Sequence, residues 1–191
     1  MAMLSILSRA IEARDEYTRG HSSRVTAIAE SIALRLGWDE ERLDLLQLGG
    51  PLHDVGKLAI SDDVLRKPGR LDDDELAPIR QHPRLGARIL LRLSAFRGAL
   101  PYVLYHHERW DGNGYPTGRA GEEIPLEARV LAVADAFDAM TSDRPYRSAL
   151  SRDEALAEVE RCSGSQFDPE IVRIFLELSA EAGELTAAAA S

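Results

Sequence analysis

Residues 130–137 have the sequence VLAVADAF, an apolar run that is interrupted only by the carboxylate of Asp135. Such a run, within a longer segment of helical period, predicts a helix that is largely buried. The other long periodic segments also have helical spacing, and no stretch alternates apolar and polar residues over the length of a strand between turn residues. The sequence therefore predicts an all-α fold, with helices over 3–14, 22–36, 39–54, 72–92, 97–108, 125–141, 152–162 and 169–180.

Several of these segments end in residues that start or stop helices. Gly37 follows the second span as a C-terminal glycine, and Ser151 with Glu154 forms a capping box before the seventh. Pro83 lies inside the fourth span, so we expect that span to break near His82. The segment over 109–125 contains four glycines and two prolines, which predicts a long loop of the kind that often carries function.

Length and composition limit the class of protein. With 191 residues, 45% of them hydrophobic, the chain can bury one substantial core. We expect a single domain over 1–180 and a low-complexity C-terminal tail over 181–191. The formal net charge of −9 disfavours nonspecific attraction to duplex DNA or to an anionic membrane.

Two further features bear on where the protein works. Cys162 is the only cysteine, which excludes an internal disulfide and a cysteine-rich zinc site and fits a reducing cytoplasm. No apolar run near the start of the sequence reaches the length of a signal peptide or a membrane span. We therefore expect a cytoplasmic protein without a membrane partner.

The histidines and two aspartates stand out from the rest of the sequence. There are five histidines, of which two are adjacent and a third precedes an aspartate: His21, His53, His82, His106 and His107. Asp54 follows an apolar stretch, and Asp135 lies in the apolar run quoted above, so either carboxylate would be costly to bury without a partner. A cation is the simplest partner, and a buried salt bridge or a helix cap is the alternative for Asp135.

Imidazole and carboxylate groups together favour first-row divalent metals such as iron, manganese, zinc or nickel, whereas an all-oxygen set would favour magnesium or calcium. The candidate ligands are too many for one tetrahedral ion but suffice for two ions that share a carboxylate: His21, His53, Asp54, His82, His106, His107 and Asp135. Two ions about 3.5–4 Å apart can bind phosphate oxygens and activate water, which is an arrangement suited to phosphodiester hydrolysis.

Three motifs closely resemble the HD-GYP family: HDVGK at 53–57, HHE at 106–108 and DGNGYP at 111–116. Further matches at 17–25, 67–69 and 134–146 extend the resemblance over nearly the whole chain. The resemblance implies that 1–180 form a catalytic domain, a helical bundle of the HD type around a metal centre. It also implies hydrolysis of cyclic di-GMP to the linear dinucleotide pGpG or to GMP.

The same resemblance implies how the ions are held. One ion would bind His21, His53, Asp54 and Asp135, and the other would bind Asp54, His82, His106 and His107, so that Asp54 bridges them. We expect iron or manganese. Some family members place a glutamate four residues before the first histidine, where it helps to bind a third ion. Tyr17 occupies that position here, with Glu16 beside it, so we expect two ions.

Asp54 and Lys57 are the candidate catalytic residues, and four side chains are candidates for contact with substrate. Lys57 would bind the scissile phosphate or help to protonate the leaving oxygen, or else lie at a solvated helix end. The resemblance places Arg144 and Arg147 against phosphate or guanine, with a surface salt bridge as the alternative. Tyr115 would stack on a base or orient the substrate, or only pack within its loop.

One further residue is a candidate for support of the metal site. Asp111 could hydrogen-bond a ligand histidine, although the sequence does not indicate which one. Trp110 is expected to belong to the scaffold, and Asp138 has no role that the sequence suggests.

Two other functions compete with cyclic di-GMP hydrolysis. One is an HD phosphohydrolase that acts on another nucleotide or on cyclic GMP-AMP. The other is a catalytically silent module that binds a cyclic dinucleotide or a diguanylate cyclase. The intact ligand positions, Lys57 and the complete Gly114-Tyr115-Pro116 motif weigh against silence. A diguanylate cyclase partner and a homodimer are further expectations, and family members usually carry a sensory or receiver domain before this one.

Overall fold

The computed structural model describes residues 6, 7, 10, 11, 13, 14, 20–67, 69, 72–143 and 148–189, except for the side chains of 73 and 183–189. Over this part of the chain the backbone forms α-helices and short 3-10 helices, and no strand is present. The nearest approach to a sheet there is an isolated bridge between Ser163 and Phe167. The predicted all-α fold is confirmed.

From α2 to α10, the longest connection between consecutive α-helices is the segment between α7 and α8. Their bounds are α2 (His21–Arg35), α3 (Glu40–Gly49), α4 (Asp62–Leu65), α5 (Asp73–Ile79), α6 (His82–Leu90), α7 (Leu100–Tyr105), α8 (Leu126–Thr141), α9 (Arg152–Arg161) and α10 (Pro169–Ala189). Short 3-10 helices are formed by Gly50–Leu52, Val55–Ala59, Ser94–Ala99 and Gly121–Glu123.

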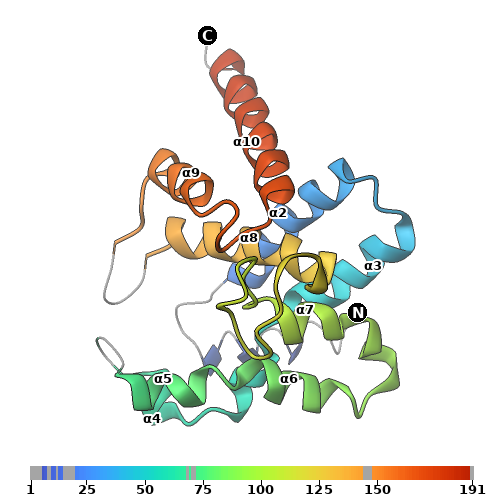
Figure 1. The fold of residues 1–191 in the computed structure, drawn as a ribbon, viewed down its shortest axis with the longest axis vertical. Coiled ribbons are helices and arrows are strands. Elements are labelled where there is room, and N and C mark those ends of the chain that lie inside the picture. The colour runs from blue at the N-terminus through green and yellow to red at the C-terminus, as the bar shows by residue number, and fades with distance from the viewer. Residues whose placement is uncertain are drawn as a thin grey trace.

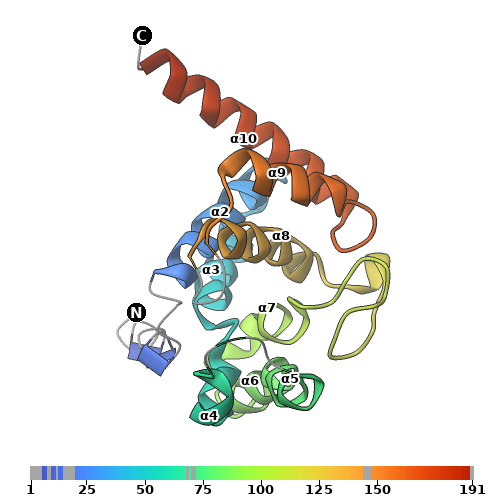
Figure 2. The same cartoon turned by 90° about the vertical axis from the view of Figure 1, so that its left-hand side faces the viewer.

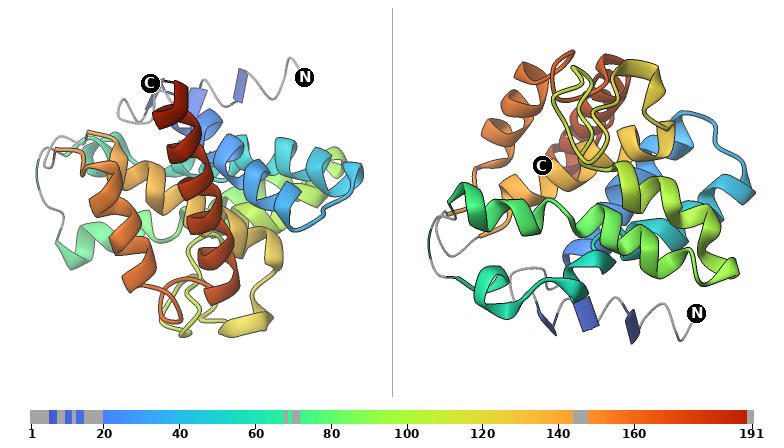
Figure 3. Two further views of the ribbon diagram at one scale, coloured as in Figure 1. Left: turned by 90° about the horizontal axis from the view of Figure 1, so that it is seen from above. Right: turned by 60° about the horizontal axis from the view of Figure 1, so that its bottom comes forward.

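Helix α8, which contains the apolar run, lies across the middle of the molecule and packs against α2 (Figure 1). Helices α4, α5 and α6 lie at one end, and α10 projects from the other. Figure 2 shows the connection between α7 and α8 looping out on one side. Helices α6 and α7 pack against each other (Figure 3). Within the described residues no helix combines the length and the apolar character needed to cross a bilayer.

The buried apolar residues form two clusters, and the site described below draws on elements of both. The larger cluster joins α2, α8 and α10 and includes Val25, Leu131 and Ile171. The smaller one joins α6, α7 and the 3-10 segments and includes Leu52 and Val103. Burial of large apolar side chains contributes about 1.5–3 kcal/mol each, so these two clusters fix the relative positions of the elements that carry the histidines.

The helix ends agree with the sequence at several places. Gly37 has the left-handed conformation with φ 74°, and Ser151 with Glu154 forms both halves of a capping box. The span over 72–92 is broken into α5 and α6, and Pro83 lies in the first turn of α6. A proline is tolerated in a first turn because the N–H it lacks would have no partner there.

Other predicted bounds were wrong. Helix α3 ends at Gly49 instead of 54, because the ring and the missing N–H of Pro51 do not fit an α-helix interior. The span over 97–108 is shortened to α7, which leaves His106 at its C-terminal cap. Helix α10 continues to Ala189, so the backbone of 181–189 is helical. The domain boundary after 180 stays a prediction.

Candidate metal centre

Asp54 is the side chain around which the other groups gather. It follows the 3-10 turn Gly50–Leu52 and is buried, with 8% of its side chain exposed. Its Oδ1 lies 3.2 Å from Nε2 of His82 and 3.9 Å from Nε2 of His106, while its Oδ2 lies 3.5 Å from Nε2 of His53. The two oxygens of one carboxylate therefore face histidines from different elements.

The ring of His53 is held by the main chain, and its Nε2 faces Oδ2 of Asp54 at 3.5 Å without a hydrogen bond. Its Nδ1 donates to the carbonyl oxygen of Gly50 at 2.6 Å, which leaves the lone pair on Nε2. This Nε2 is buried and has no hydrogen-bond partner within the described residues. A buried acceptor without a partner is costly, and a cation in contact with Nε2 would remove that cost.

His82 and His106 are oriented in the same way as His53, through Nδ1. Their Nδ1 atoms donate to main-chain carbonyls, that of His82 to Ile79 and that of His106 to Tyr102 and Val103. Both Nε2 atoms point into the site, where they lie 3.2 Å apart, and that of His82 also lies 3.2 Å from Oδ1 of Asp54. Because both Nδ1 atoms are committed to main-chain carbonyls, the two Nε2 atoms are left to share a proton or to bind a cation.

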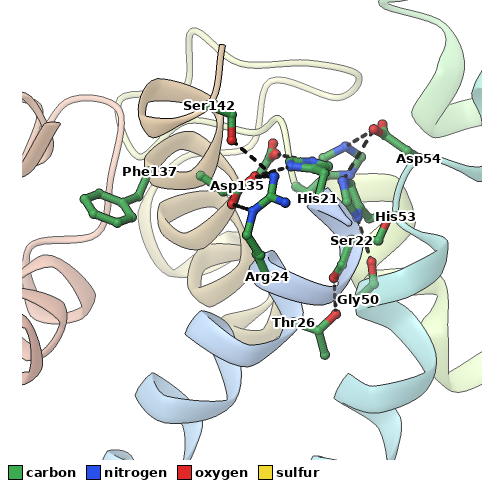
Figure 4. Close-up of polar contacts among 12 residues, drawn as sticks. His21, Ser22, Arg24, Thr26, Gly50, His53, Asp54, Asp135, Phe137 and Ser142 are labelled. Carbon is green, nitrogen blue, oxygen red and sulfur yellow. Dashed lines mark hydrogen bonds and ion pairs between the residues drawn. The ribbon is translucent and has the colours of Figure 1, made fainter. Parts of the chain in front are cut away.

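His21 is held from both sides by carboxylates of α8. Its Nδ1 lies 2.7 Å from Oδ2 of Asp138, and its Nε2 lies 3.1 Å from Oδ1 of Asp135. Arg24 in turn binds Asp138 through Nε at 2.5 Å and donates to the hydroxyl of Ser142 at 3.1 Å. Figure 4 shows His21 between Asp135 and the side where His53 and Asp54 lie. Asp138 and Arg24 thus fix the ring and direct Nε2 inward.

The ionisation of these groups follows from burial and from their neighbours. Burial opposes ionisation of Asp54, but Lys57, His53 and His82 outweigh it and hold its pKa well below the usual range. The pKa of Asp135 is likewise lowered, because its contact with His21 outweighs burial. Burial and then the charge of His82 lower the pKa of His107 to about 3. The carboxylates are therefore anionic and His107 is neutral at pH 7, which are the forms that bind metals.

His21 differs from the other histidines in its charge. Burial alone would lower its pKa, but hydrogen bonds to Asp135 and Asp138 raise it to about 9. Without a metal, the ring is therefore protonated at pH 7 and forms a buried ion pair with each carboxylate. An ion bound at Nε2 would take the place of that proton.

The candidate ligand atoms fall into two groups that share Asp54. One consists of Asp54, His82, His106 and His107, and the other of His21, His53 and Asp54, and within each group the atoms lie within 4.8 Å of one another. Asp135 adjoins the second group through His21. All seven predicted ligands are thus brought together, and this mixed nitrogen and oxygen set suits divalent transition metals.

Lys57 lies at the edge of this centre. It belongs to the 3-10 segment Val55–Ala59, and its Nζ lies 2.8 Å from Oδ2 of Asp54. The segment approaches α6 closely because Gly56 has no side chain: a Cβ there would overlap the carbonyl oxygen of His82. Gly86 on α6 lies at the same contact, and a Cβ added there would clash with the side chain of Val103. Two glycines therefore set the distance between Asp54 and His82.

The loop after α7 forms one wall of the site. Tyr115 stacks on His107 with ring centroids 4.8 Å apart and an interplanar angle of 27°. Glu108 is buried and holds the loop, since its carboxylate accepts from the backbone N–H groups of Thr117 and Gly118. Beside the ligands lies a cavity of about 460 Å³, which Tyr115, His107 and Asp135 help to line.

The structure corrects one predicted role and adds two residues. Asp111 does not contact a ligand histidine but pairs with Arg109. Asp138 takes the role that Asp111 was expected to have, and its position one helical turn after Asp135 could have indicated it. Glu108 supports the loop, which its place in the HHE motif did not reveal. The predicted substrate residues Arg144 and Arg147 lie outside the described residues, as do Glu16 and Tyr17.

A model described as an HD domain matches residues 5–171 of this sequence. The chain belongs to the HD domain family. Among curated relatives, it is 49% identical over 177 residues to the cyclic di-GMP phosphodiesterase response regulator RpfG of Xanthomonas campestris, covering 91% of this chain and 46% of that protein. It is 38% identical over 173 residues to 3'3'-cGAMP-specific phosphodiesterase 2 of Vibrio cholerae, covering 90% of this chain and 33% of that protein.

A solved HD-domain structure gives the same picture of the fold. The cyclic GMP-AMP specific phosphodiesterase V-cGAP3 of Vibrio cholerae superimposes with a TM-score of 0.72 at 24% identity, covering 93% of this chain and 48% of that one. The chain thus spans about half the length of such relatives or less. The family match and the curated relatives confirm the resemblance found in the sequence.

Proposed function

We propose that this domain is a metal-dependent phosphodiesterase that hydrolyses cyclic di-GMP to linear pGpG and, more slowly, to GMP. The single observation that carries the proposal is the pair of ligand groups that share Asp54. A shared carboxylate between two histidine-rich groups is the layout of a two-metal hydrolytic centre. The names of the curated relatives supply the substrate class, since they act on cyclic di-GMP or on cyclic GMP-AMP.

The metals that we propose are two divalent ions, iron or manganese. One would be held by His21, His53, Asp54 and Asp135, and the other by Asp54, His82, His106 and His107. When bound, such ions supply Lewis-acid activation of the phosphodiester and of a water molecule. The unpartnered Nε2 of His53 and the facing Nε2 atoms of His82 and His106 support this assignment.

Lys57 is proposed to act at the scissile bond. Its ammonium group reaches the edge of the metal centre, where it can bind a phosphate oxygen or donate a proton to the leaving oxygen. Tyr115 is proposed to contact a base or the sugar of the substrate, since it borders the cavity and is fixed on His107. Arg144 and Arg147 stay predicted substrate contacts.

Two alternative functions can be distinguished from cyclic di-GMP hydrolysis by experiment. Action on cyclic GMP-AMP is favoured by the relatives from Vibrio cholerae that act on it, and a silent binding module would bind the dinucleotide without cleaving it. The intact ligand groups support activity. A diguanylate cyclase partner, a homodimer and a cytoplasmic location also stay predictions.

The deciding experiment is incubation with cyclic di-GMP and, separately, with cyclic GMP-AMP, after loading with Mn(II) or Fe(II), with chromatographic identification of products. We expect cleavage only in the metal-loaded protein, two ions per chain by elemental analysis, and pGpG before GMP. Asp54→Ala should abolish turnover, whereas Asp44→Ala, an exposed aspartate on α3, should not change it. Near-normal turnover and metal content in Asp54→Ala would refute the bridge, and binding without cleavage would indicate a silent module.

A further inference from the structure

The cavity beside the metal centre has a second wall that none of the assigned roles uses. Besides His107, Tyr115 and Asp135, the cavity is lined by Gln166, which comes from the connection between α9 and α10. A substrate phosphate held at the metal centre would place the adjoining nucleoside in this cavity. Gln166 is then a polar side chain that the nucleoside can meet.

The backbone of Gln166 is fixed by a segment far from it in the sequence. The N–H of Trp110 donates to the carbonyl oxygen of Gln166 at 3.1 Å, and the N–H of Asp111 donates to that of Ser165 at 2.8 Å. Two residues later, Asp168 is buried and accepts from Arg129 of α8 at 2.7 Å. The loop that carries Gln166 is therefore anchored both to the segment after α7 and to α8. These contacts hold the backbone of Gln166 beside the cavity.

The side-chain amide is oriented by Arg109. NH1 of Arg109 donates to Oε1 of Gln166 at 3.2 Å, while Nε and NH2 of the same guanidinium bind both carboxylate oxygens of Asp111. An arginine only donates hydrogen bonds, so the amide oxygen must face it. The amide nitrogen then faces away from Arg109, and the group that Gln166 offers to a ligand is a donor.

The surroundings of Gln166 are suited to a base. The charge of Arg109 is balanced by its bidentate contact with Asp111. The neighbouring lining residues are apolar or small, namely Phe167, Ala132 and Ala136. Although Arg80 also lines the cavity, Phe167 and the two alanines supply an apolar surface against which a flat ring can lie beside the amide of Gln166.

We propose that Gln166 is a specificity-determining residue that selects guanine in this subsite through its amide N–H groups; the inference rests on the proposed function for its substrate class. Guanine presents two acceptors, O6 and N7, on one edge, whereas adenine presents a donor at N6 beside N7. A donor in the wall therefore favours guanine and meets the N6 amino group of adenine unfavourably. Both cyclic di-GMP and cyclic GMP-AMP supply a guanine, and cyclic di-AMP does not.

The test compares GMP with AMP as ligands of the metal-loaded protein by titration calorimetry, because the two differ only in the base. We expect about tenfold tighter binding of GMP, corresponding to one good base-edge contact. Gln166→Glu keeps the shape and the acceptor for Arg109 but replaces the donor with an acceptor, and it should abolish the preference. Gln166→Met should abolish it without adding charge, and Gln47→Glu, an exposed glutamine of α3, should leave it unchanged.

Binding and turnover separate the two proposals. Equal affinity of the parent protein for GMP and AMP, or a preserved preference in Gln166→Glu and Gln166→Met, would overturn the guanine subsite whatever the turnover. A parent protein that prefers GMP but cleaves no cyclic dinucleotide would overturn the proposed function and leave the subsite supported. In an active protein, the two variants should raise KM for cyclic di-GMP about tenfold with a smaller change in kcat.

Discussion

The contact between His21 and Asp138 shows how a carboxylate can orient a candidate ligand without itself belonging to the ligand set. Asp138 holds Nδ1 of His21, and Arg24 holds Asp138, so the ring cannot turn its Nε2 away from Asp135. Partners of this kind typically change metal affinity by about 10–100-fold when they are removed. Asp138 is therefore a positioning residue in the proposed centre.

Asp138→Ala should lower metal occupancy by a factor in that range under competition with a chelator, because His21 loses both its orientation and its ion pair. Metal content by elemental analysis measures the effect directly. Asp138→Asn, which can still accept from Nδ1, should lie between the alanine variant and the parent. Asp153→Ala on the exposed face of α9 is the matched control. Unchanged occupancy in Asp138→Ala would mean that His21 is held by other contacts.

Lys57→Arg is expected to reduce kcat by at least about tenfold although the charge is kept. A guanidinium is bulkier than an ammonium group and is a far poorer proton donor, and the Lys57 side chain is mostly buried, with 16% exposed, beside Oδ2 of Asp54. Steady-state turnover at saturating cyclic di-GMP, with metal content measured in parallel, checks the prediction. An arginine variant as active as the parent would leave Lys57 with an electrostatic role alone.

At the scale of side chains, the sequence pointed to the candidate ligands, which the structure brings together, more clearly than to the residues that hold them. The adjacent pairs His53-Asp54 and His106-His107 are conspicuous among only five histidines, and a lone aspartate in an apolar run, Asp135, asks for a partner. For Asp138 the only signal was its place one helical turn after Asp135, because its partners lie on α2 and the packing of α2 on α8 brings them together.

At the scale of elements, the approach of the 3-10 segment Val55–Ala59 to α6 determines whether Asp54 and His82 can meet. Gly56→Ala should force the two elements apart, because its Cβ would overlap the backbone oxygen of His82 and a backbone atom cannot move out of the way by changing rotamer. We expect a loss of about 1–3 kcal/mol in the free energy of unfolding, measured with denaturant, together with reduced metal content.

The control for Gly56→Ala is Gly37→Ala. Gly37 has a positive φ but nothing within 4 Å of a Cβ, so the substitution tests backbone strain without a clash. Its cost should be about 1 kcal/mol, with metal content intact. If Gly56→Ala keeps its metal and its stability, the close approach is not needed for the site.

The sequence predicted the elements well where end signals were strong, and poorly where prolines and glycines acted together. The capping box of α9 and the break before α6 were visible as local patterns. The end of α3 was missed because the leucine pattern continues through Leu52, whereas Pro51 diverts the backbone into a 3-10 turn. That turn presents His53 and Asp54 to the site, so the local irregularity and the proposed function coincide.

At the scale of the whole molecule, bound ions should stabilise the fold, because the ligand groups come from α2, α6, α8 and the segments between them and exist only in the folded chain. An ion at 100 times its Kd adds about 2.7 kcal/mol, which corresponds to roughly 5–10 °C in Tm for a chain of this size. Removal of metal with a chelator should lower Tm by that amount, as followed by circular dichroism.

Asp54→Ala is the control for that measurement, since its Tm should respond much less to the chelator. Equal Tm values before and after verified metal removal would show that the ions do not link the elements. Because the net charge is −9, divalent ions can also bind weakly at acidic surface sites. Added salt should displace those ions but should leave ions in the buried centre in place, so the metal content at high salt distinguishes the two.

The separation of His21 and Asp138 along the chain, 117 positions, also has a consequence for how the protein comes to be made. Closing a loop of that length is entropically unfavourable, and pairings between distant segments are slow compared with local helix formation. We therefore expect the contact between α2 and α8 to form after the helices themselves. During synthesis, the candidate ligands are complete only after Asp135 of α8 has left the ribosome, so we expect ion capture to follow the emergence of α8.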